Sequence, residues 1–228
     1  GNVVHISSGI SALVVALVIG KRKKIKSITP HNLPMTLLGA GILWFGWFGF
    51  NAGSALAVNG VALNAFITTN TSAAASALTW CLCELIVRKK VTSLGLASGI
   101  VVGLVAITPG AGFVSPMASI LIGGIGGIIC YFSVTVVKIK FGYDDALDAF
   151  GCHGIGGIWG GIATGIFASK AINSAGANGL IHGNSKLLGI QLLAIIATVA
   201  YSAIMTFIIL KILGKFMSLR VKIGRAHV

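Results

Sequence analysis

The chain has 228 residues, of which 56% are hydrophobic and only 9% are charged, and its formal net charge is +13 at pH 7. Soluble domains are about 45–50% apolar and about 25% charged, so this composition excludes an ordinary soluble domain and predicts a membrane protein. The positive charge lies in the gaps between apolar runs, which indicates membrane topology and argues against nucleic-acid binding.

Seven apolar runs are candidates for membrane-spanning helices, because a helix needs about 20 apolar residues to cross the hydrocarbon core. The fourth run is short, and the sequence Thr-Pro-Gly at residues 108–110 ends it, since proline cannot continue the helix backbone. We therefore predict an all-α membrane protein, a polytopic bundle of about seven transmembrane helices. In chain order the runs are roughly Val3–Gly20, Pro34–Ala57, Leu63–Val87, Thr92–Ile107, Met117–Val137, Leu147–Ala168 and Leu187–Leu210.

The basic residues give the expected orientation of these runs. The loops after the first, third and fifth runs, together with the tail after the seventh, hold thirteen Lys and Arg residues, whereas the other side holds Lys170 and Lys186. Lys and Arg are enriched on the cytoplasmic side of a membrane, so the thirteen are expected in the cytoplasm. The first run then crosses from outside to inside, and the sixth crosses in the opposite direction.

Two histidines occupy matching places in these oppositely directed runs. His5 precedes Lys21 by sixteen residues, and His153 precedes Lys170 by seventeen. Inverted repeats place a functional site near the middle of the membrane, so this relation favours a shared polar site over two separate packing residues. An imidazole can donate through one nitrogen and accept through the other, and it titrates near neutral pH. The pair could therefore share and relay one proton, while apolar walls would oppose a second charge.

The stretch DDALDAFGCHGIGG holds three of the four acidic residues of the chain beside the second histidine. Acidic side chains at a helix start cap free N–H groups and offset the helix dipole, and we expect this of Asp144 and Asp145. Asp148 is expected to be a buried structural anchor. Asp148 and His153 are five residues apart, about 140° around a helix, so they need not touch.

An aromatic cluster, WFGWFGFNAGSA, occupies residues 44–55 of the second run. Such a cluster is most often packing or an interfacial belt. This one continues into Asn51 and Ser54 near the predicted external end. Aromatic faces attract cations and a hydroxyl can accept from an N–H donor, so the cluster also suits the capture of ammonium.

The cysteines do not form a recognisable site. Cys81, Cys83, Cys130 and Cys152 lie within apolar runs, at spacings that fit neither a disulfide framework nor a zinc site. We expect them to be small core residues, and we expect neither a metal nor a cofactor.

Three long motifs resemble one family. VVHISSGISALVVALVIGKR, HNLPMTLLGAGILWFGWFGFNAGS and especially DALDAFGCHGIGGIWGGIATGIF are similar to the ammonium transporter (Amt/Mep/Rh) family, most closely its bacterial Amt branch. The resemblance implies an eleven-span fold of two inverted five-helix repeats plus a last long helix, assembled as a homotrimer with a pore through each subunit. This chain would supply spans five to eleven, in a partial transmembrane domain over residues 1–221.

The resemblance also implies a pore. His5 and His153 correspond to the twin pore histidines of the family, and Trp47 would line the pore near them. In the family, ammonium is selected outside and deprotonated, and ammonia passes through an apolar lumen while the histidines relay the proton.

Three further residues match positions of the family around this pore. Phe50 resembles one of two stacked gate phenylalanines, and Ser54 resembles the hydroxyl of the ammonium recruitment site. Asp148 matches the acid of the D-x-F-x-x-H-G signature. The partner gate phenylalanine and the recruitment-site tryptophan would lie upstream of Gly1.

Two other functions remain open. An ammonium sensor would use the same pore to report to a partner, and bacterial members of the family dock a PII-type signalling protein on the cytoplasmic face. A membrane-embedded hydrolase would use Ser7, Ser8 or Ser54 as nucleophile and a histidine as base. We favour the transporter, a protein of the cell membrane that is not an enzyme, because the aromatic and serine cluster explains cation capture without a reaction.

Both ends of the chain are expected to differ from a natural protein. The chain begins without a Met and without a basic signal-peptide region, which predicts a cut from a longer protein. KIGRAHV, residues 222–228, could be encoded by a widely used sequencing adapter, so we expect these residues to be a non-native tail.

Overall fold

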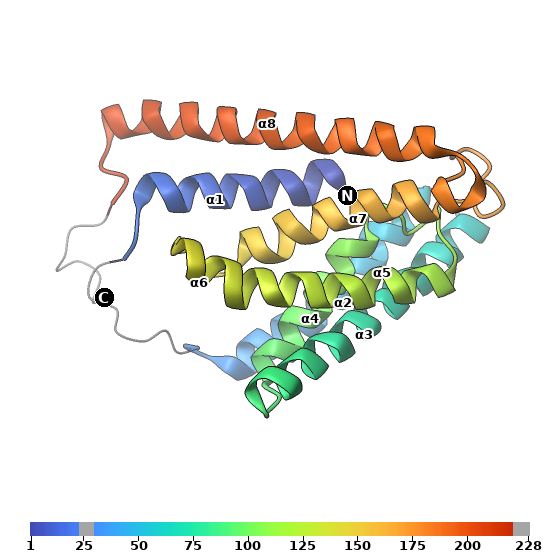
Figure 1. The fold of residues 1–228 in the computed structure, drawn as a ribbon, viewed down its shortest axis with the longest axis horizontal. Coiled ribbons are helices and arrows are strands. Elements are labelled where there is room, and N and C mark those ends of the chain that lie inside the picture. Colours follow the sequence, from blue (N-terminus) through green and yellow to red (C-terminus); the bar gives the residue numbers. More distant parts are fainter. Residues whose placement is uncertain (23–29, 221–228) are drawn as a thin grey trace.

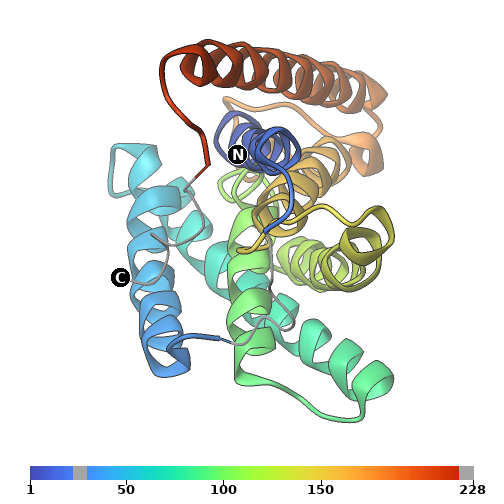
Figure 2. The same ribbon diagram turned by 90° about the vertical axis from the view of Figure 1, so that its left-hand side faces the viewer.

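The computed structural model describes residues 1–22 and 30–220, and within these ranges the chain is helical and has no strand. Most of the basic loop after the first run, and the tail at residues 222–228, lie outside the described residues. The long helix α8 (Ser185–Phe216) lies beside α1 (Ser7–Ile19) along one edge of the molecule (Figures 1 and 2). Figure 2 shows α4 (Ser93–Ile107) between α2 (Leu33–Ala52) and α5 (Pro116–Phe132).

Each of the seven predicted runs corresponds to a helical segment. Several of these segments contain a short π-helical or 3-10 turn at one end. The two longest helices are α8 and α3. The remaining elements are η1 (Asn2–Ile6), η2 (Gly53–Ala55), α3 (Gly60–Arg88), η3 (Ser133–Val137), α6 (Lys138–Phe141), η4 (Phe150–Ile155), α7 (Gly156–Phe167) and η5 (Leu180–His182).

Four helical segments of the described chain are long and apolar enough to cross a membrane by length and composition alone. Of the other three, α4 has only 15 residues, α3 carries many Ser and Thr residues, and the η4–α7 segment is rich in glycine. Helices that pack against protein on several sides need less apolar surface than helices that face lipid. The four segments are Asn2–Ile19, Leu33–Ala55, Pro116–Phe141 and Ser185–Phe216.

Side-chain caps set the starts of the five helices that follow loops. In each case the residue before the helix accepts a hydrogen bond from a backbone N–H of the first turn, which satisfies a donor that the helix leaves unpaired. The end of α4 at Ile107 agrees with the end predicted from the Thr-Pro-Gly sequence. The capping residues are Asn32, Asn59, Thr92, Ser115 and Asn184.

The sixth and seventh runs differ from their predicted boundaries. The sixth helix begins at Phe150 and not at Leu147, because Asp148 adopts a left-handed backbone conformation with φ of 55°, which interrupts a right-handed helix. The seventh continues beyond Leu210 to Phe216. The lysines in these last turns can reach water with their long side chains, so the end of the apolar run is not the end of the helix.

Close backbone contacts join the helices around the centre of the molecule. Gly103 of α4 and Gly123 of α5 both lie against the backbone of Ser72 in α3, where a Cβ atom on either glycine would clash. On the other side, α1 packs against η4 and α8, η1 packs against α7 and α8, and α7 also contacts α4 and α5. The predicted pore residues lie on three elements, with His5 in η1, His153 in η4, and Trp47 and Phe50 in α2.

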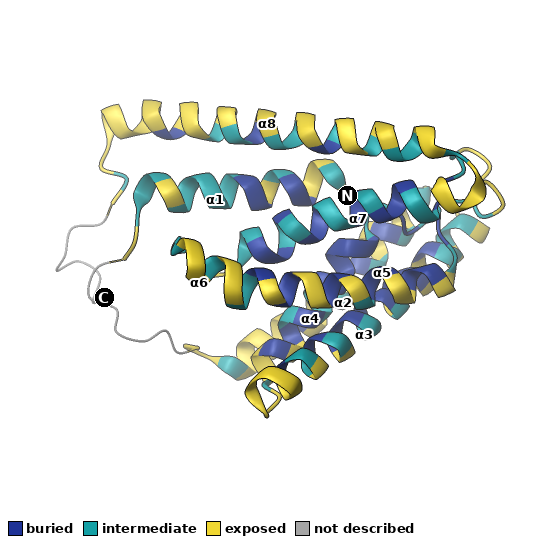
Figure 3. Ribbon diagram, in the orientation of Figure 1, coloured by how far each residue is buried: buried dark blue, intermediate teal, exposed yellow. Residues whose placement is uncertain are grey.

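Much of the outer surface is apolar. Figure 3 shows a nearly continuous exposed stripe along the outer side of α8, where Leu193 and Ile196 are 69% and 66% exposed. An apolar surface of this extent is unfavourable in water and favourable in a hydrocarbon layer. The arrangement agrees with the predicted class, an all-α membrane protein.

Candidate functional site: a histidine pair beneath an aromatic stack

The two histidines singled out in the sequence lie in contact at the centre of the bundle. The Nδ1 atoms of His5, in η1, and His153, in η4, are 3.2 Å apart, and the two rings are partly stacked with centroids 5.4 Å apart. His5 is buried, and its Nε2 atom has no hydrogen-bond partner among the described residues. An imidazole pair linked through Nδ1 leaves both Nε2 atoms to face other groups.

Three glycines allow the two helices to approach closely enough for this contact. A Cβ atom on Gly9 of α1 would fall on the backbone of Gly154, the residue after His153. A Cβ on Gly157 would lie 3.1 Å from the Cβ of His5 and 3.2 Å from the backbone nitrogen of Ile6. Small residues are the usual means of close helix packing in membranes, and here they bring the two rings together.

An aromatic stack lies against one face of the pair. The indole of Trp47 is nearly parallel to the His5 ring, with an interplanar angle of 12° and centroids 5.3 Å apart. Phe50 meets both rings edge-on, with centroids 6.3 Å from His5 and 5.7 Å from Trp47, and it is 44% exposed. The stack therefore connects the buried histidine to a partly exposed aromatic ring.

A hydrogen bond fixes the orientation of the indole. Trp47 Nε1 donates to Thr108 Oγ1 over 2.9 Å, and the Thr108 hydroxyl donates in turn to the carbonyl of Leu104 over 2.7 Å. Because a buried indole N–H without a partner is costly, Thr108 holds Trp47 in the plane that stacks on His5.

The serines named in the sequence analysis make backbone hydrogen bonds. Ser54, in the exposed turn η2, donates to the carbonyl of Phe50 over 2.6 Å. Ser8 donates to the carbonyl of His5 over 3.0 Å, and Ser7 donates to Val3 and Val4. A serine nucleophile needs a histidine within hydrogen-bond reach of its hydroxyl, and none of these serines has one among the described residues. The geometry gives the hydrolase interpretation no support.

Asn51, which extends the aromatic cluster in the sequence, does not join the stack by hydrogen bonding. Its side-chain amide is buried and donates to Thr69 Oγ1 of α3 over 2.9 Å. This residue therefore ties α2 to α3, and within the described part of the chain no hydrogen bond links it to the histidines.

The acidic residues before the second histidine have three different environments. Asp145 is buried and accepts from the backbone N–H of Phe150, so it caps the start of η4 as expected. Asp148 forms an ion pair with Lys138 over 2.6 Å, which anchors the loop to α6. Its side chain is 30% exposed, so Asp148 is only partly buried, and the expectation of a buried position was wrong. Lys138 reaches it from the polar end of α6, where water has access to both groups.

Asp144 was wrongly expected to cap a helix. Its carboxylate receives three hydrogen bonds from Arg22, one from the backbone nitrogen and two from the guanidinium. The side-chain hydrogen bond from Arg22 lowers the pKa of Asp144 from 3.8 to about 2. The Arg22–Asp144 pair thus links the end of α1 to the loop that precedes the second histidine.

Within residues 1–22 and 30–220, no group of three His, Cys, Asp or Glu side chains lies close enough to bind a metal ion. The four cysteines are free thiols, and only Cys130 and Cys152 are fully buried. The candidate site itself is formed by two imidazoles and their aromatic neighbours.

Comparison with known proteins identifies the family of the chain. The model of the Ammonium Transporter Family matches residues 1–226. The chain belongs to this family. The resemblance found in the three sequence motifs is thereby confirmed.

Relatives of the Ammonium Transporter Family resemble the chain in sequence and in fold. An ammonium transporter of Bacillus subtilis is 60% identical over 220 residues, which cover 96% of this chain and 54% of that protein. The crystal structure of Saccharomyces cerevisiae Mep2 superposes with a TM-score of 0.91 at 37% identity, covering 98% of this chain and 52% of that one. A solved structure described as "Sensor Amt Protein" has a TM-score of 0.86 at 33% identity, with coverages of 97% and 55%. The chain thus spans about half the length of these relatives.

In this member of the Ammonium Transporter Family, sequence reasoning missed two parts of the site. Thr108 was interpreted only as part of the end of a helix, because nothing in the local sequence indicates that its hydroxyl has a partner on α2. Gly9 was passed over, since it has no glycine four residues away in α1 to suggest a packing motif. Both residues act through neighbours that are distant in sequence.

Proposed function

We propose that the protein transports ammonium across the cell membrane through a pore that contains His5 and His153. Ammonium is recruited outside and deprotonated, and ammonia then passes the histidine pair while the proton is relayed separately. The family and its named ammonium transporters support the substrate class. The contact between the two imidazoles is the single observation that carries the relay.

The 3.2 Å separation of the Nδ1 atoms allows one proton between the rings. If His5 carries that proton on Nδ1, its Nε2 is an acceptor, while His153 accepts at Nδ1 and carries its own proton on Nε2. A proton arriving at Nε2 of His5 can then displace the shared proton toward His153, which releases its Nε2 proton on the far side. One transfer thus exchanges the tautomers of both rings, and they must return before the next transfer.

The aromatic stack supplies selectivity in this proposal. Aromatic faces attract a cation as it loses water, which favours ammonium at the exposed edge of Phe50. The Ser54 hydroxyl, which donates to a carbonyl, keeps its lone pairs to accept an N–H of ammonium. Phe50 and Trp47 then form the gate and the wall of the pore, and Asp148 has a structural role at the start of η4.

The remaining features of the proposal are inferred from membership of the family. The protein is a multi-pass protein of the cell membrane, forms a homotrimer with one pore in each subunit, and is not an enzyme. The tail after α8 lies in the cytoplasm, and a PII-type signalling protein docks on that face.

A second candidate function is ammonium sensing, and the similarity to the structure described as "Sensor Amt Protein" favours it. A sensor would use the same recruitment site and report occupancy to a partner. The two functions differ in the full-length reading frame, because a sensor requires an appended signalling domain. They also differ in flux, since a sensor can bind ammonium without sustained transport.

The test is proton-coupled ammonium current in liposomes that contain the full-length protein. His153→Ala is expected to abolish or alter the current without loss of trimer assembly, because it removes one half of the relay. His182→Ala, in the short turn η5, is the matched control and should leave the current unchanged. An unchanged current and unchanged substrate selectivity in His153→Ala would contradict the proposal.

A further inference from the structure

The sequence contains two Asn-Gly pairs, and the structure places them in opposite environments. Asn59–Gly60 stands at the start of α3, and Asn178–Gly179 lies in the loop between α7 and η5. An Asn-Gly pair is reactive in water because the backbone nitrogen of the glycine can attack the side-chain amide of the asparagine, and glycine has no Cβ atom to obstruct that attack. The environment of each pair therefore decides whether it reacts.

The reaction is a deamidation in two steps. In the first, the glycine nitrogen bonds to Cγ of the asparagine and gives up its proton, while the bond between Cγ and the side-chain nitrogen breaks. Ammonia leaves and a succinimide ring remains. In the second, one water molecule opens the ring at either carbonyl, which gives aspartate or isoaspartate. The reaction needs no oxidant or catalyst, but it requires a glycine nitrogen free of hydrogen bonds, space for the ring and access to water.

The pair at the start of α3 meets the first two requirements. Gly60 is the first residue of the helix, and its N–H has no hydrogen-bond partner among the described residues, because a helix leaves its first N–H groups unpaired. A Cβ atom on Gly60 would meet no atom within 4 Å, so there is room for the ring. Leu56 and Val58, just before the pair, are almost fully exposed. The segment thus stands clear of the rest of the described chain.

The cap of α3 also activates the amide of Asn59. Its Oδ1 atom accepts a hydrogen bond from the backbone nitrogen of Ala62 over 3.0 Å. Negative charge develops on this oxygen when the nitrogen adds to Cγ, and both the N–H donor and the positive end of the helix dipole stabilise that charge. The stabilisation is greater during the reaction than in the neutral amide, so the cap favours the attack.

The second pair is held in place by its surroundings. The backbone nitrogen of Gly179 donates to the carbonyl of Ala168 over 2.7 Å, and Gly179 is buried. A Cβ atom on Gly179 would lie 2.5 Å from the carbonyl oxygen of Ile166, which leaves no room for a ring. Asn178 is fixed as well, since its Oδ1 accepts from the backbone nitrogen of Lys170 over 2.8 Å. The folded structure therefore protects this pair.

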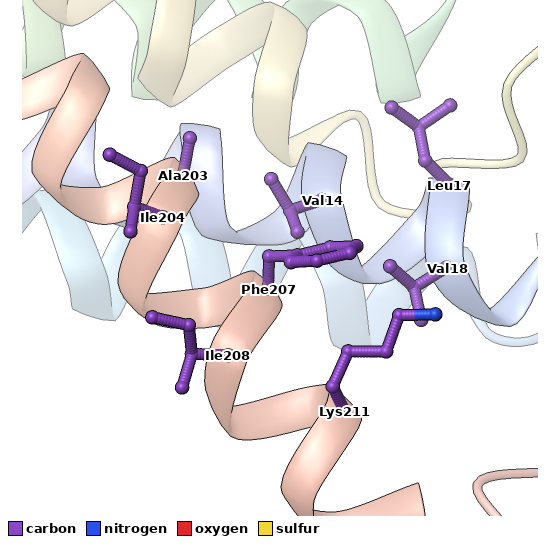
Figure 4. A pocket seen from close by; sticks show the side chains of 8 residues that line it. All are labelled: Val14, Leu17, Val18, Ala203, Ile204, Phe207, Ile208 and Lys211. Atoms are coloured by element: carbon purple, nitrogen blue, oxygen red, sulfur yellow. The ribbon is translucent and has the colours of Figure 1, made fainter.

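Exposure at the start of α3 is exposure to water. Loops gather at this end of the bundle, where Asn64 of α3 donates to the carbonyl of Ala111 and the backbone nitrogen of Ser169 donates to that of Phe113. Irregular backbone of this kind does not face hydrocarbon. The groove of about 660 Å³ between α1 and α8 is different, because Figure 4 shows it lined by apolar side chains and a single lysine, Lys211. Exposed side chains along that groove suit hydrocarbon, whereas those before α3 suit water.

We propose that Asn59 is a site of spontaneous deamidation in the folded protein, whereas Asn178 is protected. The product places a negative charge where the chain has none. Glu84 lies near the other end of α3, and the remaining three acids precede η4, at the opposite end of that segment from Ser169. The new carboxylate is therefore the first acidic side chain at this end of the bundle.

The charge follows Ser54 by five residues in the sequence. In the proposed function Ser54 recruits ammonium, and a carboxylate nearby attracts the cation to the same face. This consequence rests on the proposed function, whereas the deamidation does not.

The first test measures the modification in the full-length protein by peptide mass spectrometry. After incubation in mildly alkaline buffer made with heavy-oxygen water, the peptide with Asn59 should gain solvent oxygen as aspartate and isoaspartate about tenfold faster than the peptide with Asn178, since attack at Gly179 must first break its hydrogen bond. In denaturant the two rates should become similar. Gly60→Ala should slow the reaction at Asn59 several-fold and leave Asn178 unchanged. Equal rates in the folded protein, no product at Asn59, or a difference that persists in denaturant would overturn the proposal.

The second test separates the modification from its consequence for recruitment. Asn59→Asp reproduces the charged product, and Asn59→Ser is the matched control because serine caps a helix without a charge. At low ionic strength Asn59→Asp should lower the ammonium concentration that gives half-maximal current about twofold, and added salt should remove the difference. Equal responses of the two variants would contradict the electrostatic consequence, and the peptide measurement would still decide the modification.

Discussion

Replacing Gly9 with alanine is expected to separate the two histidines without touching either ring. In α1, Gly9 faces the backbone of η4, and a Cβ atom at this position would lie 3.0 Å from the carbonyl carbon of His153 and closer still to Gly154. Ordinary contacts of a Cβ atom are 3.4–4 Å. Backbone atoms cannot rotate away as a flexible side chain can, so the helices themselves must move.

The size of the movement decides its effect on the relay. Carbon atoms are most stable about 3.5–4.0 Å apart, so α1 must shift by roughly 1 Å from η4. The Nδ1 atoms, now 3.2 Å apart, would then exceed hydrogen-bond distance. A misplacement of about 1 Å can lower the rate of a step that depends on geometry about a hundredfold. Alanine also favours the helix by about 1 kcal/mol over glycine, but overpacking costs about 1–3 kcal/mol, so the expected net loss of stability is between about 0 and 2 kcal/mol.

The assay combines function and structure in the full-length protein. Gly9→Ala should lower proton-coupled ammonium current in liposomes and lengthen the Nδ1 to Nδ1 distance in a structure of the variant, while trimers still form. Gly189→Ala is the matched control, because a Cβ atom on this α8 glycine meets no atom within 4 Å. A folded Gly9→Ala protein that keeps both the wild-type current and the histidine contact would refute the reasoning.

Three further predictions concern the supports of the site. Thr108→Val leaves the indole N–H of Trp47 without its acceptor and should lower the free energy of unfolding by about 1–3 kcal/mol, measured by thermal unfolding in detergent; an unchanged midpoint would contradict it. Glu84→Ala removes the acceptor of two hydrogen bonds at the start of α4 and should lower the free energy of unfolding by about 1.5–3 kcal/mol in the same assay. A smaller decrease would show that water replaces the carboxylate. Arg22 lowers the pKa of Asp144 from 3.8 to about 2, so the stabilising contribution of their pair should be present above about pH 4 and lost as the pH falls through about 2. In Arg22→Gln, the pKa of the Asp144 carboxyl, measured by carbon NMR, should shift upward. Equal titration midpoints in the wild type and the variant would exclude the pair.

Sequence reasoning succeeded where a sequence pattern follows from the physical properties of the membrane. Apolar runs must be about as long as the hydrocarbon core is thick, so the helical segments could be located without a structure. The expected direction of each run came from the distribution of Lys and Arg, and that expectation related His5 to His153 in the sequence analysis. Their contact could therefore be predicted from residues 148 positions apart.

Sequence reasoning failed where one side chain had several available partners. Asp144 and Asp145 are adjacent acids before a helix, and the capping rule applies equally to both. Only Asp145 caps Phe150, because the end of α1 brings Arg22 to Asp144. The choice between cap and ion pair depends on the distance between two loops, which no local pattern records.

The local geometry of the two histidines extends the repeat relation beyond what the sequence indicates. Both lie in π-helical turns, His5 in η1 and His153 in η4, although the residues around them differ. A π-turn is rare, widens the helix and occurs often at functional sites, because the extra residue per turn redirects a side chain. The glycines that allow close packing do not explain these two turns, because Gly9, in α1, lies after His5, and Gly157, in α7, lies after His153. The two histidines thus share a π-helical turn as well as their contact, in which the Nδ1 atoms lie 3.2 Å apart.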